Sequence, residues 1–191
     1  MDEFTASASA LIEEALDWLR DHYGLYEFSV ERDLVWTVQT HLRRLVGERG
    51  LPYLVLSDYP MLAGSRRSVF ADLVIRDKPT GAIVAAEFRY EPEHRRTEFM
   101  AMPGKLPVAV WGAEGVAKDV SRSRTFVEQG AANAAFAVFI DEGRYFRHRP
   151  PHPGSRWVDW DVSVPGSATP SVLLSRWPLE CQQERQPTGP T

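Results

Sequence analysis

Residues 68–90, SVFADLVIRDKPTGAIVAAEFRY, constrain the fold more strongly than any other part of the sequence. Two runs rich in β-branched and apolar residues flank a Lys-Pro-Thr-Gly turn, which is the pattern of a β-hairpin. Proline at the second position and glycine at the fourth fit a type I turn. A turn centred on the Pro-Thr bond places Asp72 opposite Glu87, with Arg89 on the same side of the sheet.

Two carboxylates that face each other across a hairpin repel one another, and burial makes the repulsion stronger. A hard divalent cation, held by the carboxylates and by substrate oxygens, would relieve that repulsion. A salt bridge from Arg89 to one acid, with the other acid solvated, would relieve it too. The residues of this hairpin therefore leave both a metal site and an ordinary ion pair open.

The rest of the chain changes between helical and strand-like patterns. Apolar residues at helical spacing predict helices over residues 6–22, from residue 29 to Gly47 or Gly50, and over 115–130. Apolar runs bounded by turn residues predict strands over 51–59, 68–76, 81–90, 134–141 and 143–149, with edge strands within 150–162 and 170–177. This order predicts an α/β fold with a mixed central sheet flanked by helices.

A chain of 191 residues that is 43% hydrophobic and 25% charged has the size and composition of one globular domain. We expect that domain over residues 1–180 and a disordered tail over residues 181–191, which lack apolar periodicity. The one cysteine, Cys181, cannot form an internal disulfide, which favours a reducing compartment. The acidic start does not resemble a secretory signal, and no apolar run is long enough for a membrane span. We therefore expect a cytoplasmic protein without a membrane partner.

The order helix, three strands, helix, strand over residues 29–141, with Asp72 on the second strand and Glu87-Phe88-Arg89 on the third, resembles the PD-(D/E)xK nuclease superfamily. This superfamily is also called restriction-endonuclease-like. The stretches EFRYEPEHRR and FVEQGAANAAFAVFIDEGRYFRHR resemble a bacterial group within it. The resemblance implies an αβββαβ core, to which this chain adds an N-terminal helix and C-terminal strands.

The resemblance also implies a nuclease that depends on Mg²⁺ or Mn²⁺ and acts on DNA or RNA. Asp72 and Glu87 correspond to the acids that hold the metal. Glu31, at the start of the helix before the first strand, is the natural third member. Arg89 stands where the family has a lysine, and Ala71 stands where it has a proline. Arginine cannot act as a general base, but it can hold a phosphate and stabilise developing negative charge.

Basic residues beside the two strands are candidates for contact with substrate, namely Arg66, Arg67, His94 and Arg95. The resemblance adds Arg122, on the helix over 115–130, where members of the superfamily often present basic side chains to nucleic acid. Ordinary surface charge is the alternative interpretation for the arginines, and a solvated loop residue is the alternative for the histidine. The formal net charge of −4 argues against binding of nucleic acid by overall charge alone. A nuclease-like module that binds or assembles without catalysis is therefore the second functional hypothesis, and the oligomeric state stays open, with a homodimer as one candidate.

Overall fold

The computed structural model describes residues 1–64, 68–95, 108–162 and 169–178. Its helices are α1 (Glu3–His22), α2 (Glu31–Glu48) and α4 (Val116–Glu128), with a 3-10 turn, η1 (Tyr23–Leu25), after α1. Its strands are β1 (Tyr53–Leu62), β2 (Val69–Asp77), β3 (Ile83–Glu91), β4 (Ala134–Asp141), β5 (Ser155–Asp159) and β6 (Ser171–Trp177). The three predicted helices are confirmed, with small shifts at their ends. None of the described helices is long and apolar enough to cross a membrane.

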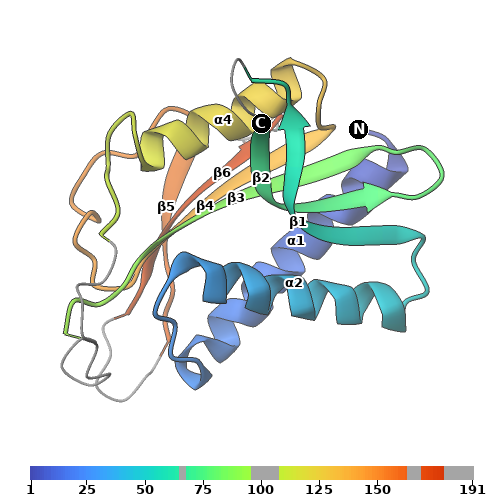
Figure 1. Cartoon of the computed structure of the whole chain (residues 1–191). Coiled ribbons are helices and arrows are strands. Elements are labelled where there is room, and N and C mark those ends of the chain that lie inside the picture. Colours follow the sequence, from blue (N-terminus) through green and yellow to red (C-terminus); the bar gives the residue numbers. More distant parts are fainter. Residues whose placement is uncertain (65–67, 96–107, 163–168, 179–191) are drawn as a thin grey trace, which may run out of the picture.

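The described strands form one six-stranded mixed sheet in the order β1-β2-β3-β4-β6-β5. β3 and β4 run parallel, with α4 between them in the chain, whereas the other neighbouring strands are antiparallel. Helices α1 and α2 cover one face of the sheet and α4 covers the other (Figure 1). The predicted α/β fold with a mixed sheet between helices is confirmed.

The core lies on both faces of the central strands. Every residue of β4 is buried, which requires helices on both sides of the sheet. On one face, the apolar stripe of α2, including Leu34, Val38 and Leu42, packs with α1 against the sheet. On the other face, Phe126 of α4 is fully buried against the hairpin of β2 and β3. Burying these stripes holds α2 and α4 at fixed positions above and below the strands.

The β2–β3 hairpin has the register that its turn predicts. Val74 pairs with Ala85, and Asp77 donates its backbone N–H to the Ala82 carbonyl oxygen at 2.9 Å, which closes the turn. Gly81 lies in the left-handed region, with φ of 78°, where glycine is favoured because it has no side chain. Cross-strand pairing ends at Leu73, one residue before Asp72.

Two expectations about the C-terminal third were wrong. Residues 143–149 form turns, because the Asp141 carboxylate accepts hydrogen bonds from the backbone N–H groups of Tyr145 and Phe146, at 2.9 and 2.6 Å. The place beside β4 is taken by β6, which is therefore an interior strand, and only β5 lies at that edge. Trp160, which follows β5, packs in the core against Tyr23, with ring centroids 5.6 Å apart. The tail of residues 181–191 lies outside the described residues.

Candidate functional site

The sheet opens at Asp72. Beyond Leu73, β2 no longer pairs with β3 and pairs only with β1. The free end of the β1–β2 hairpin packs against α4 (Figure 1). Asp72 therefore does not pair directly with Glu87 across the strands, as the turn register had predicted. Its carboxylate instead accepts a hydrogen bond from the backbone N–H of Phe88 at 2.7 Å. Across β1, Asp58 lies level with Asp72 and has a φ of 49°, a left-handed conformation that aspartate tolerates. The carboxylates of Asp58 on β1 and Asp72 on β2 thus lie at the point where β2 separates from β3.

Glu31 reaches this opening from the other side because it is the first residue of α2. The Asp33 carboxylate fixes that helix start by accepting hydrogen bonds from the hydroxyl and backbone N–H of Ser29, at 2.8 and 3.1 Å. It also accepts the backbone N–H of Val30 at 3.2 Å. Glu31 was expected here from the family resemblance, and the helix start brings it to the same hollow as Asp72.

A chain of ion pairs joins the predicted acids through two residues of α4. The Asp119 carboxylate accepts Nε and Nη2 of Arg89 on one oxygen, at 2.8 and 2.7 Å, and Nη2 of Arg122 on the other, at 2.7 Å. The same Nη2 of Arg122 contacts Glu87. Nη1 of Arg89 lies 3.3 Å from Glu31. The carboxylates of Asp119, Glu87 and Glu31 therefore share two guanidinium groups. Asp72 adds a fourth carboxylate nearby, which leaves formal negative charge in excess when all are ionised.

Burial in this cluster favours the protonated form of the acids. It raises the pKa of Glu87 to about 10, with the neighbouring Asp72 adding to the rise and Arg122 opposing it. It raises the pKa of Glu31 to about 7, against the attraction of Arg89. The pKa of Asp72 is raised by burial too, although its hydrogen bond from Phe88 acts the other way. Like charges in a poorly solvated place have this effect, and it is common at functional sites.

A hollow of about 370 Å³ lies over the acids on the side of α2. Glu31, Arg32, Val35, Trp36, Gln39, Ser57, Asp58 and Asp72 line it. Three of these residues are acidic, and they come from α2, β1 and β2. The hollow therefore opens Glu31, Asp58 and Asp72 to solvent, whereas Glu87 is fully buried and does not line it.

The side chains here have the chemistry that a hard divalent cation requires. All of the candidate donors are carboxylate oxygens, which Mg²⁺ and Mn²⁺ prefer. Within the described part of the chain, Glu87 Oε1 is buried without a hydrogen-bond partner, and a cation or a proton would satisfy it. No three His, Cys, Asp or Glu side chains of the described residues are arranged around one point as metal ligands. The donor set fits a metal in kind, while arginines contact Glu87 and Glu31 in the arrangement observed.

The basic residues that were predicted to contact substrate have different positions in the structure. Arg66 and Arg67 lie outside the described residues. Arg122 belongs to the cluster itself, where it contacts Glu87 and Asp119, so it is not a free surface cation. Arg95 is exposed and lies 3.4 Å from Glu93.

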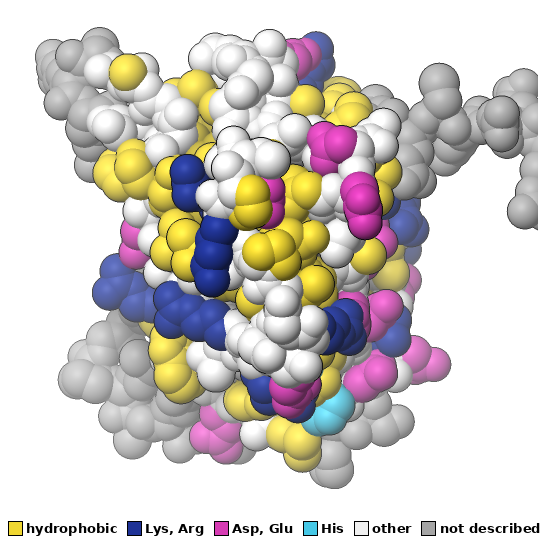
Figure 2. All heavy atoms as spheres, turned by 90° about the vertical axis from the view of Figure 1, so that its right-hand side faces the viewer, with side chains coloured by type: hydrophobic (Ala, Val, Ile, Leu, Met, Phe, Trp, Pro, Cys, Tyr) yellow, Lys and Arg dark blue, Asp and Glu magenta, His cyan; other side chains and the backbone are white. Residues whose placement is uncertain are grey.

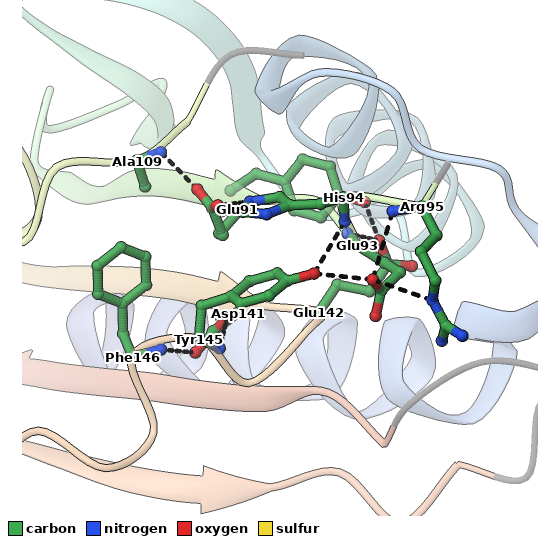
Figure 3. A network of polar contacts seen from close by, with 10 residues as sticks. Glu91, Glu93, His94, Arg95, Ala109, Asp141, Glu142, Tyr145 and Phe146 are labelled. Atoms are coloured by element: carbon green, nitrogen blue, oxygen red, sulfur yellow. Dashed lines mark hydrogen bonds and ion pairs between the residues drawn. The ribbon is translucent and has the colours of Figure 1, made fainter. Parts of the chain in front are cut away.

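His94 belongs to a polar network that ties the end of β3 to the turn after β4 (Figure 3). Its Nε2 lies 2.5 Å from Oε1 of the buried Glu91, and its ring stacks on Tyr145 with centroids 3.9 Å apart. The Tyr145 hydroxyl donates to Glu93 at 2.7 Å, and Glu142 accepts the backbone N–H of Glu93 at 2.8 Å. The His94 imidazole is therefore engaged in structural contacts with Glu91 and Tyr145.

Asp119 and Asp58 were not predicted from the sequence. Asp119 lies three residues before Arg122 on a helix, and this spacing signals an intrahelical ion pair but not its contact with Arg89. Asp58 is an aspartate within a strand pattern, and strands disfavour aspartate. That mismatch was the signal available in the sequence.

On the side of the molecule that Figure 2 shows, which is the right-hand end in Figure 1, Lys and Arg, Asp and Glu, and hydrophobic side chains are interspersed, and no single charge dominates. Comparisons of the chain with family models, with curated proteins and with solved structures found no match.

Proposed function

We propose that the protein is a nuclease of the PD-(D/E)xK type that depends on Mg²⁺ or Mn²⁺ and hydrolyses phosphodiester bonds in DNA or RNA. The observation that carries this proposal is the gathering of Glu31, Asp72, Glu87 and Arg89 where β2 leaves β3. The order α2, β1, β2, β3, α4, β4 supports it, because the superfamily has an αβββαβ core.

Each residue then has a distinct role. Asp72 and Glu87 would hold the cation, which when bound offsets negative charge at the scissile phosphate. Glu31 accepts a proton from the attacking water, since its pKa of about 7 suits a base near neutral pH and it lines the same hollow as Asp72. The water oxygen bonds to phosphorus, the bond from phosphorus to the leaving sugar oxygen breaks, and solvent protonates that oxygen.

Arg89 binds the phosphate and does not act as a base. Asp119 holds its Nε and Nη2, which fixes the guanidinium plane. Among the described residues, Nη1 has only the longer contact to Glu31, at 3.3 Å, and is the group best placed to donate to a phosphate oxygen. Phosphate binding of this kind stabilises negative charge as it develops during hydrolysis.

A nuclease-like module that binds or assembles without cleavage is the second candidate. The contacts of Arg122 with Glu87 and of Arg89 with Asp119 favour it, because they neutralise the acids without a metal. In that case the cluster is a structural ion-pair network, and Mg²⁺ does not bind to it.

Cleavage assays test the leading proposal directly. The full chain is incubated with labelled single-stranded DNA, duplex DNA and RNA in Mg²⁺ or Mn²⁺, and products are followed on denaturing gels. We expect Asp72→Asn and Glu87→Gln to lower the cleavage rate at least about a hundredfold, because each removes charge that binds the metal. Glu128→Gln, on the exposed side of α4, is the matched control and keeps the rate.

Two further results separate the candidates. Equal cleavage by the parent protein, Asp72→Asn and Glu87→Gln would reject the assignment, because the activity would come from elsewhere. Calorimetry that detects no Mg²⁺ binding, together with no cleavage of any substrate, would favour the module without catalysis. Cleavage by Arg89→Lys, with no cleavage by the parent protein, would show that the arginine suppresses an otherwise competent site.

A further inference from the structure

The N-terminal half of α2 presents two side chains to solvent that no part of the mechanism above uses. Arg32 and Trp36 lie one helical turn apart, so they share one face of the helix. Trp36 is 64% exposed, whereas Leu34 beside it is fully buried in the core. A large aromatic side chain left this far in water contributes little to folding and commonly marks a contact surface.

Arg32 is a free cation in the part of the chain that the structure describes, since its side chain has no ion pair or hydrogen bond there. It lies where three hollows meet. One is the hollow of about 370 Å³ over Asp72, and the second, of about 300 Å³, reaches Arg89. The third, of about 400 Å³, is the most apolar, and Tyr26, Phe28 and Trp36 contribute to its wall.

We propose that Arg32 and Trp36 form a binding site for a single-stranded nucleic acid beside the candidate catalytic hollow. The Arg32 guanidinium binds a backbone phosphate next to the one at Asp72, and the Trp36 indole stacks on an unpaired base, with the apolar hollow below it. This inference deepens the proposed function and rests on it for the position of the scissile phosphate. Stacking on an aromatic side chain combined with a cation on the backbone is the usual way in which proteins hold single strands.

Two observations favour a single strand over a duplex. Bases within a duplex are stacked on each other, so they have no free face for Trp36. The surroundings of Arg32 are also acidic, since Glu27, Glu31, Asp33, Asp58 and Asp72 line the same three hollows. A duplex carries about one phosphate per 1.7 Å of its length, and this acidic surface would repel it more than a flexible single strand.

Fluorescence anisotropy with a short labelled oligothymidine and a labelled duplex tests the site. Binding is measured in Mg²⁺ in an Asp72→Asn background, which keeps the strand intact, and the cleavage assay is run separately on the parent chain. We expect Arg32→Ala and Trp36→Ala each to weaken single-strand binding at least about fivefold. Trp36→Phe keeps an aromatic face and recovers most of the affinity.

Salt dependence separates the two roles. The slope of log affinity against log salt falls by about 0.7 in Arg32→Ala, as expected for one lost phosphate contact to a single strand, and stays unchanged in Trp36→Ala. Arg156→Ala is the matched control, because Arg156 is also exposed and unpaired among the described residues, but lies on β5 at the far edge of the sheet. It keeps both the affinity and the slope.

Three results would overturn the inference: no binding of the oligothymidine or of the duplex, equal binding by all variants, or tighter binding of the duplex than of the single strand. Cleavage by the parent chain combined with any of these would leave the nuclease proposal standing without this binding site. Single-strand binding that depends on Arg32 and Trp36 without cleavage would reject the nuclease and keep the site.

Discussion

Asp119 neutralises two guanidinium groups from a position almost closed to solvent. Its side chain is 4% exposed, and it accepts hydrogen bonds from both Arg89 and Arg122. We expect Asp119→Asn to lower the free energy of unfolding by about 3–5 kcal/mol, because it leaves two partly buried cations without their shared anion. Urea denaturation measures the change. Asp17→Asn, which removes an exposed partner of Arg20, should cost less than about 1 kcal/mol, and equal losses in the two variants would contradict this explanation.

The raised pKa of Glu87 makes stability depend on pH in the metal-free protein. An unfolded chain releases this proton near the usual pKa of 4.5, whereas burial raises the pKa of Glu87 in the folded protein to about 10. Between these values the folded state holds a proton that the unfolded state has lost, so the free energy of unfolding falls as pH rises. Glu31 adds to the fall only up to its pKa of about 7.

Glu87→Gln tests this dependence, because glutamine keeps an oxygen for Arg122 but does not titrate. Urea midpoints measured in EDTA from about pH 5 to about pH 9 should fall less steeply in Glu87→Gln than in the parent protein. Glu128→Gln, at an exposed position, should keep the parent slope. Parallel slopes in Glu87→Gln and the parent would mean that Glu87 is already ionised at neutral pH.

At the scale of single elements, the turn between β2 and β3 sets the register that places Asp72 near Glu87. Gly81 has a φ of 78°, and an added Cβ would lie 3.1 Å from Arg76 Nη2. We expect Gly81→Ala to lower the free energy of unfolding by about 1–2 kcal/mol, since alanine is strained in this conformation. Gly47→Ala, in α2 with open space around the new methyl group, should instead raise it by up to about 1 kcal/mol.

Thermal or urea unfolding of both glycine variants checks the opposite signs. No loss of stability in Gly81→Ala would show that the turn conformation does not limit the hairpin, and a loss in Gly47→Ala would show that α2 does not tolerate the added methyl group. Both variants change the same atoms, so their comparison removes the effect of the substitution on the unfolded chain.

The elements that were predicted well are those whose apolar and turn residues form a pattern within one stretch of the sequence. The boundaries of β4 were predicted correctly because eight consecutive buried residues lie between turn residues, and the hairpin register followed from Pro79 and Gly81. Residues 143–149 have a strand-like pattern, but the Asp141 side chain takes up two of their backbone N–H groups. Competition between a side chain and the β-ladder is decided by three-dimensional geometry, which the pattern does not contain.

The same distinction holds for the site. Asp72, Glu87 and Arg89 were placed together because one hairpin carries all three. Their contacts were not predictable, since Asp119 and Arg122 come from α4, about thirty residues further along the chain, and only packing of α4 on the sheet brings them to the strands. Opening of the sheet beyond Leu73 likewise depends on tertiary packing of the β1–β2 hairpin against α4.

At the scale of the whole molecule, the proposed metal site couples cation binding to protons and to stability. The acids come from α2 and from the strands, so a cation bound to them joins layers of the fold that separate on unfolding. Any ligand that binds only the folded state raises its stability. A cation must also displace the proton that burial keeps on Glu87, and its affinity should therefore increase with pH.

Proton release on Mg²⁺ binding is the most direct measure of this coupling. Near pH 8, the pKa of Glu87 at about 10 leaves it protonated, while the pKa of Glu31 at about 7 leaves it mostly ionised. Calorimetric titration in two buffers with different ionisation heats should therefore show release of about one proton per Mg²⁺. Glu87→Gln should bind Mg²⁺ more weakly and release almost none, whereas Glu128→Gln should behave like the parent protein. A binding heat that is the same in both buffers would mean that Mg²⁺ does not reach Glu87, and that Arg122 keeps this carboxylate.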